Sequence, residues 1–271
     1  MKNWIKGRLL ESAVRRRIRA WRALYENASS CDQPAVLCEP GGGCIVVLAP
    51  HMDDEVLGCG GTIARHVRAG ASVTVIFLTD GRHGSMTNGV VGESERVRRQ
   101  HELIAIRKQE AGRAGEVLGV HAVIFLDAED RQLRSDIHAA GRLRDVLDSR
   151  RPNLVYLPFF LDRHPDHRAA NDVLLTATAG TALDFECRGY EVWTPLFPNC
   201  LVRIDETIEL KKSAMACYQS QLAEMDYLHH VLGLNAYRSS ALGKAVRFAE
   251  AFHALALADY RRLHQAVCRP S

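Results

Sequence analysis

Residues 44–70, "CIVVLAPHMDDEVLGCGGTIARHVRAG", decide the fold class of this chain. The apolar run 45–49 is short and is bounded by Pro50, which is typical of a strand that is buried on both faces. The segment 57–69 begins with several glycines and ends at Gly70, which indicates a helix with a glycine stop. One histidine and three acids stand between strand and helix. A buried strand that leads directly into a helix is the repeating unit of a parallel α/β sheet.

The same alternation continues along the chain. Further strands are predicted at 72–80, 121–127 and 153–159, and helices at 93–119, 133–150 and 168–180. Strands that alternate with helices favour right-handed βαβ units. The sequence therefore predicts a Rossmann-like, doubly wound, mostly parallel α/β sheet. Beyond residue 180 the pattern is less regular, with short apolar runs at 191–196 and 200–205 and helices expected over 207–222 and 244–263.

The composition is that of an ordinary globular protein. The chain has 271 residues, of which 47% are hydrophobic and 25% are charged, and its formal net charge is +3. We therefore expect a single domain over residues 40–271. So small a net charge gives no reason to expect nucleic acid as a partner, and no apolar run approaches the roughly 20 residues of a membrane span. We expect a cytoplasmic protein whose eight cysteines, none of them in a C-x-x-C pair, are reduced thiols.

Residues 1–30 differ in kind from the rest of the chain. Apolar side chains recur there at helical spacing, at Trp4, Leu10, Val14, Ile18, Trp21 and Leu24, and arginines occupy the other faces. This pattern predicts a basic amphipathic helix followed by a linker. Two interpretations stay open. The helix packs on the domain, or residues 4–24 contact a membrane surface or a protein, which would place the chain at the periphery of a membrane.

Two polar clusters follow strands of the predicted sheet. The turn at 51–54 comes directly after the first strand, and the motif "HPDH" at 164–167 comes after the fourth. In the strand order 3-2-1-4 these two strands are neighbours, so both clusters would face the same crevice at the carboxyl edge of the sheet. Either cluster alone could be a helix cap or a polar loop. Their convergence favours a metal site.

The residue types suit a hydrolytic metal centre. His51 and Asp54 are three residues apart, so both would point to one side of a helical turn. With His167 they supply two imidazoles and one carboxylate, which leaves a coordination position for water. Asp53 would remain free as a general base, and His164 as an acid or as a stabiliser of an oxyanion.

Two further features would border this centre. Asp166 could orient His164 or His167 by accepting a hydrogen bond from the imidazole. The segment 81–94 is rich in glycine and small polar residues, which is typical of a loop at the edge of a substrate pocket.

The pair of motifs "PHMDDEVLGCGG" and "HPDH" resembles the LmbE-like, or PIG-L, family of zinc-dependent N-deacetylases. Weaker similarities extend the resemblance over roughly residues 44–222, among them "RKQEAGRAGEVLGV" at 107–120, "LDAEDRQL" at 126–133 and "KKSAMACYQSQL" at 211–222. Met52 stands where the family more often has a proline, and it replaces no ligand.

The resemblance implies a function and a role for each site residue. It implies removal of an N-acetyl group from an N-acetylglucosamine-like sugar of a biosynthetic intermediate, which gives acetate and a free amine. The implied cofactor is Zn²⁺, with Fe²⁺ as an alternative occupant of the same ligands. The implied roles are metal ligands for His51, Asp54 and His167, general base for Asp53, acid or oxyanion contact for His164, and substrate contacts for Arg107 and Asp130.

Other classes of protein share parts of this pattern. Two histidines and one carboxylate also describe iron(II)-dependent enzymes, and another metal-dependent amide hydrolase could use the same three side chains. A nucleotide-binding Rossmann enzyme is disfavoured because "GCGG" follows the acids and does not form G-x-G-x-x-G. A metal-dependent binding protein without activity would need neither Asp53 nor His164.

Overall fold

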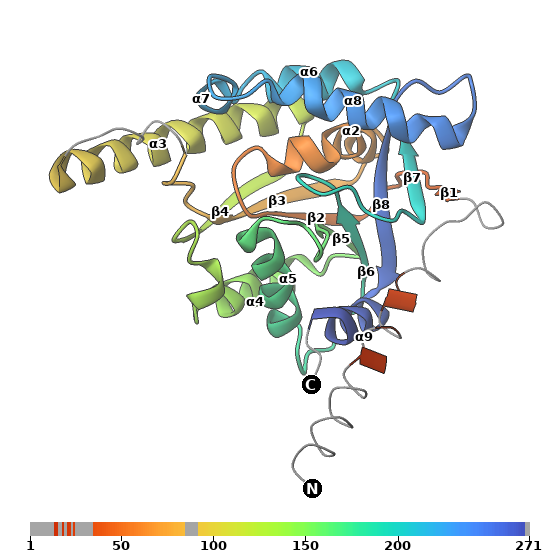
Figure 1. The fold of residues 1–271 in the computed structure, drawn as a ribbon, viewed down its shortest axis with the longest axis horizontal. Helices are drawn as coiled ribbons and strands as arrows, with labels where there is room; N and C mark the ends of the chain where they lie inside the picture. The colour runs from red at the N-terminus through yellow and green to blue at the C-terminus, as the bar shows by residue number, and fades with distance from the viewer. Residues whose placement is uncertain are drawn as a thin grey trace, which may run out of the picture.

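The computed structural model describes residues 14, 15, 18, 21, 22, 24, 35–84 and 92–268, and it is built around one mixed sheet (Figure 1). The strands are β1 (Val36–Leu37), β2 (Cys44–Ala49), β3 (Ser72–Thr79), β4 (Ala122–Ala128), β5 (Leu154–Pro158), β6 (Glu186–Tyr190), β7 (Cys200–Arg203) and β8 (Ala249–Ala256). The helices are α2 (Asp54–Arg68), α3 (Glu93–Leu118), α4 (Ala139–Arg150), α5 (Pro165–Ala177), α6 (Ile208–Met215), α7 (Gln219–Leu222), α8 (Tyr227–Ser239) and α9 (Leu257–Cys268), with 3₁₀ turns at Leu133–Ser135 and Ser240–Leu242.

The strand order confirms the predicted topology. It runs β1-β7-β8-β6-β5-β2-β3-β4, so the first and fourth predicted strands, β2 and β5, are direct neighbours. β2 pairs in parallel with β3 on one side and with β5 on the other. β8 is antiparallel to both β6 and β7. The chain therefore reverses its winding direction between β2 and β5, and this is where the ligand crevice of an open α/β sheet forms.

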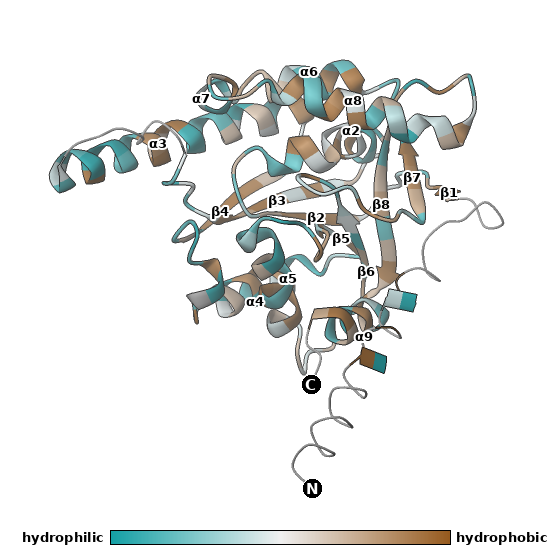
Figure 2. Ribbon diagram, viewed as in Figure 1, coloured by the Kyte–Doolittle hydropathy of each residue, from teal (hydrophilic) through white to brown (hydrophobic). Residues whose placement is uncertain are grey.

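Helices cover both faces of the sheet. Figure 1 shows α2, α3, α6, α7 and α8 over one face and α4, α5 and α9 over the other. Alternate residues of β2 face opposite ways, because Val46 and Leu48 belong to one buried cluster while Ile45 and Val47 belong to the other. In Figure 2, β6 and β8 also carry hydrophilic residues, whereas β2, β3 and β4 are mostly coloured as hydrophobic. Burial on both faces explains why such strands read as continuous apolar runs.

The region after residue 180 differs from the prediction. The single helix expected at 244–263 is wrong, because residues 249–256 form β8 and the helix α9 starts only at Leu257. Alanine and leucine favour a helix locally, but the slot between β6 and β7 lets this segment pair on both sides. The helix expected at 207–222 is divided into α6 and α7, and neither α8 nor β1 was predicted.

Two observations concern the cysteines and the N-terminal segment. Cys38 and Cys200 form a disulfide that links the ends of β1 and β7, so the prediction of reduced thiols throughout is wrong for this pair. In the N-terminal segment Ile18 and Trp21 are exposed, whereas Leu24 is buried in the cluster beneath α4 and α5. Trp4 and Leu10 lie outside the described residues. None of the helices that the structure describes combines the length and apolarity of a membrane crossing.

Candidate active site

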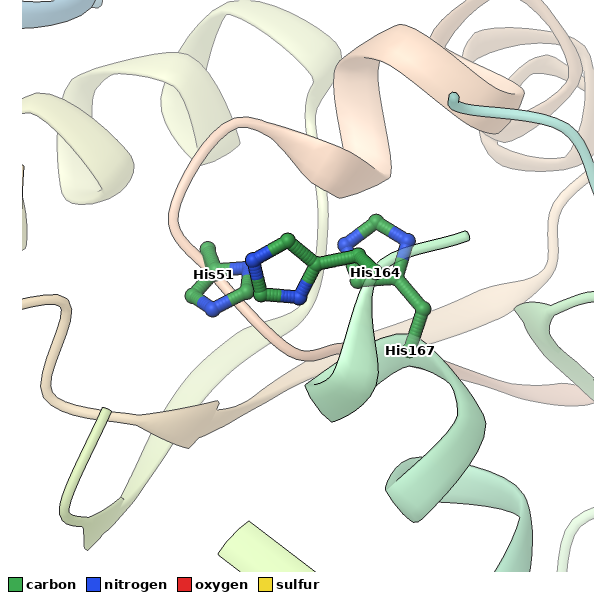
Figure 3. Close-up of side chains that lie close together, drawn as sticks. All are labelled: His51, His164 and His167. Carbon is green, nitrogen blue, oxygen red and sulfur yellow. The ribbon is translucent and has the colours of Figure 1, made fainter. Parts of the chain in front are cut away.

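The histidines of the two predicted clusters lie together at the carboxyl ends of β2 and β5 (Figure 3). His51 projects from the turn that joins β2 to α2, while His164 caps α5 and His167 lies in its first turn. The ring centroid of His51 is 4.7 Å from that of His164 and 5.5 Å from that of His167. The sheet topology thus brings together side chains that are more than a hundred positions apart, as the strand order predicted.

The carboxylate of Asp54 lies between two of these imidazoles. Its Oδ2 atom is 3.2 Å from Nδ1 of His51 and 3.2 Å from Nε2 of His167. The ring of His167 is fully buried, and neither of its nitrogens makes a well-aligned hydrogen bond, although the carboxylates of Asp54 and Asp162 lie 3.2 and 3.3 Å from them. Unpaired buried nitrogens are costly, and the ligand atoms of a tetrahedral ion with bonds of about 2.1 Å lie about 3.4 Å apart. The donor types therefore suit a divalent cation, and the spacing of Asp54 from each of the two imidazoles fits one.

Other side chains beside His51 also offer ligand atoms. The imidazoles of His51, His164 and His167 have nitrogens within 4.8 Å of one another, and so do ligand atoms of His51, Asp130 and Asp166. His51 is common to these sets and to the predicted one. The cluster as a whole offers more oxygen and nitrogen donors than a single tetrahedral ion needs.

The acid predicted to orient a histidine contacts a different histidine from the predicted ones. The carboxylate of Asp166 lies 3.3 Å from Nε2 of His51 and accepts a hydrogen bond from the backbone of Arg131, so the prediction that it orients His164 or His167 is wrong. Its contact with His164 is made by the backbone, because the N–H of Asp166 donates to Nδ1 of that ring in the helix cap. Asp162 takes the predicted place instead, with Oδ1 3.3 Å from Nδ1 of His167.

The carboxylates give the three histidines different proton affinities. Burial by itself would lower the pKa of His51, but hydrogen bonds to Asp130, Asp166 and Asp54 raise it well above its usual value. Burial would likewise lower the pKa of His167, and its carboxylate neighbours raise it to about 9. Burial and the other two imidazoles lower the pKa of His164 to about 4. His164 is therefore the neutral imidazole of the group.

The two adjacent aspartates are also driven apart in pKa. Burial raises the pKa of Asp53 to about 7, and the charge of Asp54 acts in the same direction. Burial would raise the pKa of Asp54 too, but His167 and His51 lower it far below its usual value. A permanently ionised carboxylate suits a ligand, and a carboxylate that titrates near neutral pH suits a general base.

The backbone of Asp53 is strained and is held from both sides. Its φ of 142° and ψ of −26° lie in a region that residues other than glycine rarely adopt. The carbonyl of Met52 accepts a hydrogen bond of 2.8 Å from Arg107, and the N–H of Asp53 donates to Glu55 over 3.2 Å. These two atoms belong to the same peptide unit. The buried side chains of Arg107 and Glu55 therefore hold that peptide in the orientation that places the Asp53 side chain.

The groups that hold this peptide are themselves fixed. The second carboxylate oxygen of Glu55 accepts a hydrogen bond of 2.5 Å from the hydroxyl of Tyr218, which is fully buried. Arg107 also donates to the carbonyl of Gly81, and its guanidinium is 3.7 Å from Oδ1 of Asp53. The carboxylate of Asp53 makes no capping bond to α2, so it is not simply a helix cap.

A cavity of about 380 Å³ opens above these residues. Most of the predicted site residues line it: His51, Asp53, Asp54, Arg107, Asp130 and His164. His167 and Asp166 are buried behind this wall. His83 and Gly84 also line the cavity, as predicted for the loop that contains them, while residues 85–91 lie outside the described part of the chain.

Several residues of the site carried no signal that sequence analysis used. Asp162 accepts the backbone N–H of His164 two residues later, which is a recognisable aspartate turn. Glu55 and Tyr218 are 163 positions apart, and no local pattern connects them. Trp193 and Tyr227 line the cavity from segments that were predicted irregularly or not at all.

Comparison with known proteins identifies the family. The PIG-L model, described as GlcNAc-PI de-N-acetylase, matches residues 46–178. The diacetylchitobiose deacetylase of Thermococcus kodakarensis is 29% identical over 196 residues, which cover 66% of this chain and 70% of that protein. The solved structure of the conserved protein TT1542 from Thermus thermophilus is 30% identical with a TM-score of 0.63, covering 78% of this chain and 93% of that one. The 4-oxalmesaconate hydratase of Pseudomonas putida is 32% identical over 115 residues, or 41% of each chain.

A buried histidine–aspartate cluster at the carboxyl edge of a Rossmann-like sheet is an arrangement that can hold a metal ion and activate water for hydrolysis. The chain belongs to the PIG-L, or LmbE-like, family. Within that family it is a metal-dependent N-deacetylase.

Proposed function

We propose that this chain is a zinc-dependent N-deacetylase that acts on an N-acetylglucosamine-like sugar of a biosynthetic intermediate and releases acetate and a free amine. The observation that carries the proposal is the position of the Asp54 carboxylate, which lies 3.2 Å from a nitrogen of His51 and 3.2 Å from a nitrogen of His167. Asp54 and Asp53 both line the cavity beside these histidines. The diacetylchitobiose deacetylase among the relatives supports an N-acetylated sugar as substrate.

The proposed metal ligands are His51, Asp54 and His167. Bound zinc would polarise the acetyl carbonyl and lower the pKa of a coordinated water. The acids Asp166 and Asp162 lie 3.3 Å from His51 and His167 respectively, where they fix the orientation of the two rings. Iron(II) is the alternative occupant, because the same ligands suit it.

Asp53 is the proposed general base. It takes a proton from the attacking water as the water oxygen bonds to the acetyl carbon, and the pKa of about 7 suits that role at neutral pH. The carbon–nitrogen bond then breaks, and the amine leaves with a proton that Asp53 returns. The guanidinium of Arg107, 3.7 Å away, limits how far the carboxylate can turn.

His164 is the proposed contact to the oxyanion. Its Nδ1 accepts the backbone N–H of Asp166 over 3.2 Å, so a neutral ring carries its own proton on Nε2. Burial holds the pKa of His164 below its usual value, so the ring acts as a neutral hydrogen-bond donor and not as a cation.

Two further residues are proposed to contact the sugar. Asp130 lines the cavity and has one oxygen bonded to the backbone of His83 and the other 3.2 Å from His51, so it can accept a hydroxyl hydrogen. Arg107 lines the same cavity but uses its guanidinium on two backbone carbonyls.

Three expectations from the sequence stay predictions. They are a cytoplasmic location, a separate helix and linker over residues 1–30, and contact of residues 4–24 with a membrane surface or a protein.

The test is an assay for acetate. The purified chain is incubated with N-acetylglucosamine conjugates before and after treatment with a chelator, and zinc or iron(II) is then added back. Release of acetate and amine that is lost with the chelator and restored by zinc supports the proposal. Restoration by iron(II) alone would assign the other metal. Absence of acetate from every conjugate, with metal bound, would refute the deacetylase assignment for these substrates.

The hydratase among the relatives favours a second candidate. A 4-oxalmesaconate hydratase adds water to an unsaturated tricarboxylate, and it shares 32% identity with this chain over 115 residues. The same preparation is therefore offered an unsaturated tricarboxylate, and loss of its ultraviolet absorbance without acetate release from sugars would favour the hydratase.

A further inference from the structure

We propose that the substrate carries an apolar group and that this group binds in a second cavity next to the metal site. The inference rests on the proposed function and names the class of substrate. The second cavity has a volume of about 300 Å³. Four residues line both this cavity and the metal-site cavity: Leu57, Met225, Trp193 and Tyr227. A molecule whose acetamide lies at the metal site can therefore extend directly into the second cavity.

The second cavity is lined mainly by apolar and aromatic side chains. Val231 and Leu234 of α8 form one side. Trp193 and Tyr227 meet edge to face, with ring centroids 5.9 Å apart, at the boundary between the two cavities. The guanidinium of Arg163 lies 5.1 Å from the centre of the Trp193 ring. Binding of an apolar group against this lining is favourable, because water leaves the apolar surface of the group and that of the cavity.

Two polar groups of the second cavity are already engaged. Glu191 is buried, and its carboxylate accepts hydrogen bonds from Arg238 and from the backbone of Leu196. The Nδ1 atom of His230 lies 2.7 Å from the carbonyl of Asp226. A second sugar ring needs several hydrogen-bond partners, and the carboxylate of Glu191 and Nδ1 of His230 would have to break existing bonds to supply them. An apolar chain or ring needs none.

The apolar group can be linked to the sugar in two ways, through the glycosidic oxygen or as a longer acyl chain on the amide. A synthetic series separates them: a methyl and an octyl glycoside of N-acetylglucosamine, and the methyl glycoside of N-octanoylglucosamine. Each buried methylene is expected to raise kcat/KM about fourfold, so burial of three gives about 50-fold. A gain for the octyl glycoside assigns the glycosidic side, and a gain for the octanoyl amide assigns the acyl side.

Binding of products tests the inference without turnover. The methyl and octyl glycosides of glucosamine are titrated calorimetrically into the metal-loaded chain, below the concentration at which the octyl compound forms micelles. We expect the octyl compound to bind about 50-fold more tightly if the glycosidic side is used. Equal kcat/KM for all three substrates, or equal binding of both products with no gain for the amide, would overturn the inference. Acetate release from the methyl glycoside alone would leave the proposed function standing.

Variants of α8 supply the matched control. Leu234→Ser places a hydroxyl in the second cavity and should lower the octyl-to-methyl ratio of kcat/KM about tenfold. Leu228→Ser changes a half-buried leucine of the same helix that does not line either cavity. It should keep the ratio of the original chain. The same ratio in both variants would overturn the inference even if one of them folds less well, because a ratio does not depend on the amount of active protein.

Discussion

Replacement of Tyr218 by phenylalanine tests whether the peptide before Asp53 has to be held in place for catalysis. The change removes one hydroxyl from a fully buried ring. That hydroxyl donates to Glu55, whose other oxygen accepts the N–H of Asp53. No atom of Tyr218 lines the metal-site cavity, so an effect on turnover must pass through Glu55.

The expected loss of stability follows from that single bond. Burial raises the pKa of the Glu55 carboxyl to about 8, so at neutral pH the bond joins largely uncharged groups, and such a bond contributes about 1 kcal/mol. We therefore expect the free energy of unfolding to fall by about 1 kcal/mol at neutral pH. In a domain of this size that lowers the Tm by roughly 2–4 °C.

The expected loss of activity is larger than the loss of stability implies. A displaced Glu55 weakens its bond to the Asp53 peptide, whose φ of 142° is unfavourable without support. A shift of the base by about 1 Å costs on the order of 100-fold in rate. We expect kcat for acetate release to fall by 10- to 100-fold at 25 °C, with KM and metal content close to those of the original chain.

The control is another buried tyrosine. The hydroxyl of Tyr260 donates to Asn171 over 2.7 Å on the other face of the sheet. Tyr260→Phe should lower the Tm by a few degrees and leave kcat unchanged. If Tyr218→Phe keeps full kcat while folded and metal-loaded, the peptide needs no such support and the reasoning fails. Equal losses of kcat in both variants would also refute it.

The remaining predictions concern the metal, the base, a buried ion pair and pH. His167→Ala should lose bound zinc and activity together, whereas Asp53→Asn should keep zinc and lose 100-fold or more in kcat, both checked by metal analysis beside the acetate assay. Lys211→Met should cost about 3–5 kcal/mol in urea unfolding, because it leaves the carboxylate of Glu250 buried without its ion-pair partner; a change below 1 kcal/mol would contradict this. Burial lowers the pKa of His66 to about 4, whereas a histidine of the unfolded chain has a pKa near 6.5. Between these two pH values the unfolded chain binds more protons than the native chain, so the free energy of unfolding should fall by up to about 3 kcal/mol as the pH drops from 7 to 4. His66→Gln should remove that part of the slope, and an unchanged slope of urea midpoint against pH would exclude His66 as its source.

The sequence predicted the part of the fold that depends on local pattern. The apolar runs of β2 and β5 and the polar residues directly after them are continuous in sequence, and the rule for parallel sheets then placed the two clusters in one crevice. Residues 249–256 could not be assigned in this way, because a fully buried strand and a buried helix have the same composition. Their state is decided by two partner strands that lie more than 45 residues upstream.

The site was predictable to the same extent. His51, Asp54 and His167 come from compact motifs, and the structure brings them together. Which acid orients which imidazole depends on the side-chain geometry of the α5 cap, where Asp166 turns away toward Arg131. The contact of Glu55 with Tyr218 spans 163 positions and depends on how the last third of the chain packs against α2.

The origin of the candidate ligands in two distant segments ties cofactor loading to conformational stability. Asp54 and His167 are more than a hundred positions apart and meet only because β2 lies beside β5. An unfolded chain therefore offers an ion only incomplete sets of donors, and unfolding must release it. By thermodynamic linkage, free ion at a thousandfold excess over its dissociation constant adds about 4 kcal/mol to the stability of the native state. Scarcity of metal would then deplete the native population as well as stop turnover.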